Sequence, residues 1–183
     1  MKAAEKALLM AVRDQLRLPT ASNGAGYTPE QCEVEYDEMA PAVTGDLYVP
    51  VLAGGWVPGP RHNTCGGIND LVYAVRVAVV KRGSHVPRDR KRDIFLGNVG
   101  DLADEIDKIY NAIDWRYTVN DAANAIILKQ TGSSEGFTEV LKFAGIDDKP
   151  TAVDASFFGG NGKESGLMRR IWFRGARRET TKS

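Results

Sequence analysis

The chain has 183 residues with 24 acidic and 24 basic side chains, so its formal net charge is zero. Hydrophobic residues make up 43% and charged residues 26%, values typical of a soluble globular protein. This length predicts one domain with a real core, and no apolar run is as long as a membrane span. The start of the chain lacks the apolar core and cleavage site of a signal peptide. We therefore expect a protein made in a cytoplasm, without a membrane partner.

The N-terminal part predicts a helix followed by two strands. Residues 2–18 repeat apolar side chains at helical spacing and predict an amphipathic helix. Residues 32–38 alternate, which predicts a strand with Cys32 as a buried free thiol and three carboxylates on the other face. Those carboxylates indicate a solvent-exposed or inter-subunit face rather than a cation site, because no neighbouring residues fix a coordination geometry. Residues 45–52 predict a second strand, in which Pro50 indicates an edge or a bulge. The apolar face of the helix comprises Leu8 or Leu9, Val12 and Leu16.

The middle of the chain predicts the centre of the sheet. Residues 53–67 are rich in glycine and proline and predict a long loop with an exposed Trp56. Residues 71–83 alternate most regularly and predict a strand that runs through the middle of the sheet. A basic connector at residues 84–93 leads to residues 99–115, whose apolar spacing predicts the principal helix packed on the sheet.

The last third predicts a short helix and three more strands. Residues 119–130 have helical composition, with Asn120 as the N-cap and Gly132 as the left-handed residue that ends the helix. An Asn-Gly pair indicates a hairpin between the last two strands. The three strands are predicted at residues 137–143, 151–158 and 167–175.

Together these elements predict an α+β fold. We expect a mostly antiparallel sheet of five or six strands, two or three helices packed on one of its faces, and long loops. One domain should cover residues 1–178, and residues 179–183 should form a flexible tail.

Residues 132–136 match the G-x-S-x-G pattern of a hydrolase nucleophile, with Ser134 at the centre. A predicted helix precedes the pattern and a predicted strand follows it, which reverses the order that a nucleophile elbow needs. We therefore interpret the pattern as a helix end and a loop. His62 and His85 lie in loops without an orienting motif, and Cys65 beside His62 is too small a set for zinc. No glycine-rich stretch has the spacing of a nucleotide loop. We expect no enzyme activity, metal or cofactor.

Charge is spread unevenly along this neutral chain. Residues 1–46 hold eight acidic and four basic residues, and residues 101–123 hold six and two, so each stretch has a balance of −4. Residues 81–92 hold six basic residues and one acidic residue, and residues 163–183 hold seven and two, so each has a balance of +5. Such charge blocks favour contacts between subunits over a nucleic-acid-binding surface. Solvent-exposed charged faces without a partner explain them as well as subunit contacts do.

The run GGINDLVYAVRVAVVKRGSHVPRDRKRDIFLGNVGDLADEIDKIYNAID, residues 66–114, resembles the central part of tail-terminator and head–tail joining proteins of tailed phages. The closest local match is the basic connector VPRDRKRD, residues 86–93. That group has an opening helix, a strand, a loop-bearing hairpin, a long strand that ends in a basic connector, and a helix. The likeness covers residues 2–115, whereas the second helix and the basic C-terminus depart from compact versions of the fold.

The resemblance implies a virion structural protein without enzyme activity. Such a protein forms a ring, commonly a hexamer, where the tail tube ends, and it contacts the tube protein and the connector proteins of the neck. DNA would pass through the lumen without specific binding, so the lumen should lack dense positive charge. The basic connector would then pair with acidic segments of a neighbouring subunit. The candidate interface residues are Arg88, Arg90, Lys91, Arg92, Trp56, Arg169, Arg170 and Arg174.

Two other functions stay open. One is a different neck component, such as a stopper, an adaptor or a head completion protein. The other is a nucleic-acid-binding module, in which Trp172 and Phe173 would stack on bases between arginines. Neighbouring strand residues face opposite sides, so one of these two aromatics should belong to the core. The zero net charge also disfavours this module.

Overall fold

The computed structural model describes residues 2–35, 46–59, 68–83, 91–132, 135–153 and 165–180. Over these residues the chain forms three α-helices and one six-stranded antiparallel sheet, which confirms the predicted α+β fold. In chain order the elements are α1 (Ala3–Arg17), the 3-10 helix η1 (Thr20–Ser22), β1 (Leu47–Tyr48), β2 (Val51–Pro58), β3 (Ile68–Gly83), α2 (Lys91–Ile113), α3 (Tyr117–Thr131), β4 (Lys142–Ile146), β5 (Thr151–Val153) and β6 (Ser165–Thr180).

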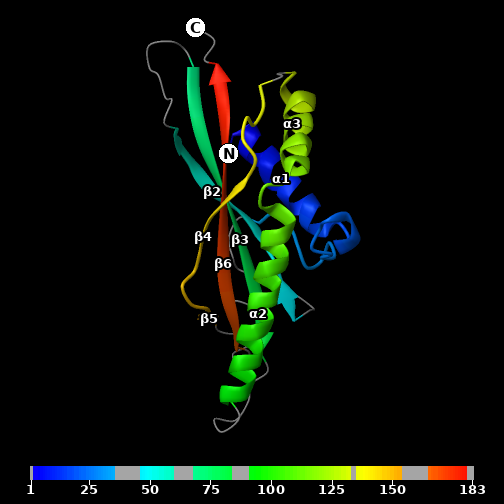
Figure 1. The fold of residues 1–183 in the computed structure, drawn as a ribbon, viewed down its shortest axis with the longest axis vertical. Coiled ribbons are helices and arrows are strands. Elements are labelled where there is room, and N and C mark those ends of the chain that lie inside the picture. Colours follow the sequence, from blue (N-terminus) through cyan, green and yellow to red (C-terminus); the bar gives the residue numbers. More distant parts are fainter. Residues whose placement is uncertain are drawn as a thin grey trace.

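Two long strands, β3 and β6, form the middle of the sheet. They pair antiparallel over all 16 residues of each strand and run along the long axis of the molecule (Figure 1). β1 and β2 pair with the other edge of β3, and β4 and β5 pair with the other edge of β6. The predicted central position of β3 is therefore confirmed. β6 reaches Thr180, so Glu179 and Thr180, which were expected in a flexible tail, lie in the strand.

All three helices lie on one face of the sheet, where α1 and α2 pack on the strands and α3 packs on α1 (Figure 1). Alternate residues of β3, including Val75 and Val77, point toward them and are almost completely buried. Phe173 of β6 has no exposed surface and belongs to the same apolar cluster. Burying such side chains contributes about 1.5–3 kcal/mol each, which makes this face the main source of stability. The predicted apolar face of α1 is confirmed, because Leu8, Leu9, Val12 and Leu16 are all buried.

Two helix boundaries differ from the prediction. α2 begins at Lys91, so the last residues of the expected basic connector belong to its first turn. α3 begins at Tyr117, and its N-cap is Arg116 instead of Asn120. The Asn120 amide instead donates to the Glu139 carbonyl oxygen at 2.5 Å, which fastens the helix to the chain leading into β4. The left-handed end of the helix is confirmed, because Gly132 has φ 67°.

The predicted strand at residues 32–38 was wrong over its described part. One parallel bridge joins Val34 to Val51, with backbone hydrogen bonds from the Val51 N–H to the Glu33 carbonyl at 2.8 Å and from the Glu35 N–H to the Val51 carbonyl at 3.0 Å. The Glu33 carboxylate points toward α1. That carboxylate accepts from Arg13 at 2.9 Å and from Arg17 at 2.8 Å. Glu35 also accepts from the Tyr48 hydroxyl at 2.5 Å, so two members of the expected carboxylate face are held within the subunit; residues 36–45 lie outside the described range.

The other strand predictions were partly right. Pro50 does interrupt the strand, since β1 ends at Tyr48 and β2 starts at Val51. Residues 53–58 belong to β2 and not to a loop; a register shift follows Ala53, where Gly55 has φ 78°. β4 begins later than predicted, at Lys142, and only an isolated bridge to β6 precedes it. The expected Asn-Gly hairpin and residues 60–67 and 154–158 lie outside the described residues.

We predict that Val77→Asp abolishes soluble expression. Val77 is fully buried in the central strand, and an unpaired buried carboxylate costs several kcal/mol, about the whole stability of a domain. Val57→Asp, at an exposed position of β2, is the matched control and should stay soluble. Comparing the soluble fractions of both variants after expression tests the prediction, and a soluble Val77→Asp variant would contradict it.

We further predict that Glu33 stabilises the fold above acidic pH. Burial raises the pKa of its carboxyl, but hydrogen bonds from the Val34 N–H, Arg13 and Arg17 outweigh burial and hold the pKa below 4.5. A carboxyl whose pKa is lowered by folding stabilises at higher pH, and this contribution is lost as pH falls through the folded pKa.

Glu33→Gln should therefore lower the melting temperature at neutral pH and flatten its fall between about pH 5 and pH 3. Asp121→Asn, which changes an exposed carboxylate on α3, is the control and should leave the pH profile unchanged. Identical profiles for wild type and Glu33→Gln would show that the ion pairs contribute nothing.

Candidate subunit interface

The junction between α2 and α3 turns sharply at Trp115. Its backbone is left-handed, with φ 58°, a conformation that costs a bulky residue roughly 1–2 kcal/mol. Two groups of hydrogen bonds hold the turn. The Trp115 N–H donates to the Leu141 carbonyl at 3.0 Å, and the Arg116 guanidinium donates to the Asn111 carbonyl at 2.9 and 3.1 Å. The chain therefore holds this residue in a strained conformation with its side chain largely exposed.

Exposed aromatic side chains gather around this turn. Trp115 is 60% and Tyr117 72% exposed. Tyr110 and Phe143 pack edge to face at 5.6 Å, and the Lys142 ammonium lies 4.9 Å from the Trp115 ring. Large exposed patches of this composition are typical of protein interfaces. We call the cluster the aromatic elbow; it comprises Leu18, Tyr110, Trp115, Tyr117 and Phe143.

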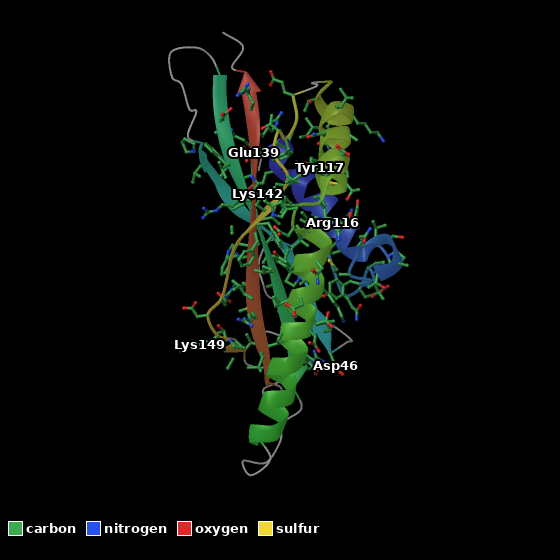
Figure 2. All side chains as sticks on the ribbon, in the orientation of Figure 1. Asp46, Arg116, Tyr117, Glu139, Lys142 and Lys149 are labelled. Carbon is green, nitrogen blue, oxygen red and sulfur yellow. The ribbon has the colours of Figure 1, made fainter. Side chains whose placement is uncertain are left out.

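Asp114 ties the aromatic elbow to the sheet. Its carboxylate accepts from the Phe143 N–H at 2.6 Å, so this part of the β4 edge is closed to a further strand. A hydrogen bond to the same carboxylate, together with its charge, raises the pKa of Tyr110. Figure 2 shows Arg116 and Tyr117 at the helix junction, and Lys142 and Glu139 on the segment that includes β4. Helix junction and strand edge thus form one continuous surface.

The exposed face of α2 that leads to the aromatic elbow is acidic. Asp104 and Asp107 are exposed, and within the described residues neither contacts a basic side chain. Their neighbours form contacts within the subunit: Asp101 pairs with Lys81 at 2.5 Å, and Glu105 accepts from Tyr27 and from Lys108, each at 2.6 Å. Asp104 and Asp107 are therefore the carboxylates of this helix face that are open to solvent or to a partner.

The opposite face of the sheet, away from the helices, is basic. Arg170 pairs with Asp147 at 3.3 Å and Arg178 with Asp70 at 3.2 Å. Arg174 is exposed, forms no ion pair in the described part of the chain, and lies directly across from another cation in β4. That cation is Lys142, whose ammonium pairs with Glu139 at 3.6 Å and lies over the Trp115 ring. We call this surface the basic sheet face; it comprises Arg170, Trp172, Arg174 and Arg178.

The structure brings only some of the predicted interface residues together. Arg170 and Arg174 share the basic sheet face. Arg169 alternates to the other side of β6, where its Nε donates to the Asp147 carbonyl at 3.1 Å. Trp56 is half-exposed on β2, with the Lys2 ammonium 4.2 Å from its ring.

The predicted basic connector is only partly described. Lys91 and Arg92 begin α2, and their side chains lie outside the described set. Arg88 and Arg90 lie outside the described residues altogether. Lys81, which precedes the connector near the end of β3, pairs with Asp101 of its own subunit.

The alternation of Trp172 and Phe173 is confirmed. Phe173 is fully buried in the core, whereas Trp172 is half-buried on the basic sheet face. Sequence reasoning missed the aromatic elbow, although residues 114–117, DWRY, gave a signal: two aromatics separated by one residue at a break between helices.

The residues considered for chemistry do not form a described site. Cys32 is buried, as predicted, and burial raises the pKa of its thiol to about 12. Among the described residues, no three His, Cys, Asp or Glu side chains are placed to hold a metal ion. Ser134, His62, His85 and Cys65 lie outside the described ranges. No helix in the described part of the chain is long and apolar enough to cross a membrane.

No protein-family model matches the chain, and no curated protein matches it. The function proposed below is therefore supported by the geometry of the two surfaces and by the sequence resemblance.

Proposed function

We propose that this chain is a ring-forming structural protein of a tailed-phage virion, the tail terminator that caps the tail tube and docks to the neck. The observation that carries the proposal is the unlikeness of two faces of one neutral molecule. The helix side presents the aromatic elbow and two carboxylates that contact no basic side chain of the described residues, and the other side presents the basic sheet face.

Unlike faces favour head-to-tail association. A symmetric dimer would place each face against its own copy, which brings like charges together. A head-to-tail contact instead joins opposite charges, and a head-to-tail contact whose rotation closes produces a ring. The zero net charge fits this arrangement, because basic and acidic surfaces balance within each subunit.

The order of elements supports a place among neck proteins. An opening helix, short strands, a long strand and a long helix follow one another, as the resemblance implies. The same order suits a stopper, an adaptor or a head completion protein, so a genetic test must separate them. In a phage lacking this protein, loss of a tube cap should give overlong tails, whereas loss of another neck component should leave tail length normal.

The nucleic-acid-binding alternative draws on one observation, the half-buried Trp172 among arginines on the basic sheet face. Two of those arginines already pair with Asp147 and Asp70. The chain as a whole carries no net positive charge to attract nucleic acid, so we favour a protein partner.

We predict that the purified protein forms a ring whose mass falls as salt is added. Exposed charges are screened beyond a Debye length of about 8 Å at physiological salt, so contacts between charged faces weaken. Reversing Arg88, Arg90 and Arg92 to Glu should weaken the ring and leave the monomer folded. Native mass spectrometry and light scattering across a salt series measure both effects.

The matched control reverses three exposed lysines, Lys6, Lys129 and Lys149, which changes the net charge by the same amount. Equal masses for wild type and the arginine variant would remove the basic connector from the interface. A monomer at all concentrations that binds short DNA would overturn the proposed function in favour of the nucleic-acid-binding module.

A further inference from the structure

We propose that the aromatic elbow is the docking surface for a second copy of this chain, and that its occupant is the basic sheet face of the next subunit. This inference rests on the proposed ring and names the two surfaces that meet in it. Trp115 is placed at the centre of the contact, with the exposed carboxylates of α2 beside it.

Charge complementarity selects this occupant. The exposed edge of the aromatic elbow continues along α2 to Asp107 and Asp104, which contact no basic side chain within the described residues. The basic sheet face holds Arg174, which contacts no acidic side chain there. Arg174 and the two carboxylates therefore offer opposite charges to one another in such a contact.

Shape and composition also agree. Beside Arg178, the basic sheet face has a hollow of about 360 Å³, lined by Val72 and Ala176 and by the charged Asp70 and Glu139. An aromatic side chain that enters such a hollow is a common anchor of protein interfaces. Arginine planes also stack on aromatic faces, so tryptophan and tyrosine suit this surface better than aliphatic side chains.

The backbone at Trp115 gives the third argument. Glycine is the residue that adopts a left-handed turn without strain, yet a largely exposed tryptophan occupies this position. Strained residues of this kind persist at binding surfaces when the surrounding structure holds them. Here the contacts of Trp115 and Asp114 with the chain at Leu141 and Phe143 hold the side chain outward before any partner arrives.

A charge swap tests the pairing of the two surfaces. Arg174→Glu alone and the pair Asp104→Lys and Asp107→Lys alone should each raise the concentration for half-assembly by about tenfold or more. Combining all three substitutions in one chain should restore assembly toward wild type. The reversal Asp121→Lys, at an exposed position of α3, is the control; it should not weaken assembly by itself and should not rescue Arg174→Glu.

The role of Trp115 as the anchor is tested separately, and the folding of each variant is measured alongside its assembly. Trp115→Gly should abolish ring formation while the melting temperature stays within about 4 °C of wild type, because glycine relieves the backbone strain. Leu128→Ala, which removes another exposed large side chain, is the control and should still form rings. A Trp115→Gly variant that folds and forms normal rings would overturn the inference.

The two proposals fail in different ways. If wild type stays monomeric at all concentrations, the ring itself is wrong, and the inference falls with it. If wild type forms rings but neither the single reversals nor Trp115→Gly changes their stability, the ring stands and these surfaces are not its interface. The pairing would also be overturned if the separate charge reversals weaken assembly but the combined variant does not restore it. Each surface would then contact something other than its proposed partner surface.

Discussion

The pairing of β3 with β6 is the constraint on which the rest of the structure depends. Its register places Val75 beside Phe173 on the helix side and Ala74 beside Arg174 on the other. Because side chains alternate, a shift of one residue in β6 would put Trp172 into the core and Phe173 among the arginines. The packing of the hydrophobic core therefore also fixes which residues of β6 lie on the basic sheet face. No further interaction is needed to align them.

The aromatic elbow inherits its position from the same register. β4 pairs with β6 through Phe143 and Phe173, and the turn at Trp115 is fastened to the residues around β4 by backbone and carboxylate hydrogen bonds. α2 is fixed in turn by its buried face and by the contact of Tyr27 with Glu105. The two surfaces that we expect to meet between subunits thus belong to one hydrophobic core. This is what ring closure requires, because a head-to-tail contact closes only when the angle between its two faces is constant.

The sequence predicts the parts of this fold that follow from local periodicity. The apolar spacing of α1 and the alternation of β3 each show one buried face, and both predictions are confirmed. It could not predict where tertiary contacts override local preference. The segment at Glu33 makes a single bridge to β2 while its carboxylate binds two arginines on α1, and Asn120 bonds to a distant carbonyl instead of capping its helix. Of the candidate interface, Arg170 and Arg174 could be placed on one face by alternation. The aromatic elbow could not, because it joins residues from separate elements through a left-handed turn that composition does not reveal.

Two features of the surface would be more favourable in the proposed assembly than in an isolated subunit. Trp115 adopts a strained backbone and leaves a large apolar ring mostly exposed. Asp104 and Asp107 carry negative charge that no basic side chain of the described residues contacts. The proposed head-to-tail contact would bury the ring and bring Arg174 of the next subunit to these carboxylates. Surface ion pairs contribute only about 0–1 kcal/mol each, so charge alone would not hold such a contact. In the proposed contact, we therefore assign the binding affinity to the aromatic anchor at Trp115. The charges determine which face of one subunit meets which face of the next.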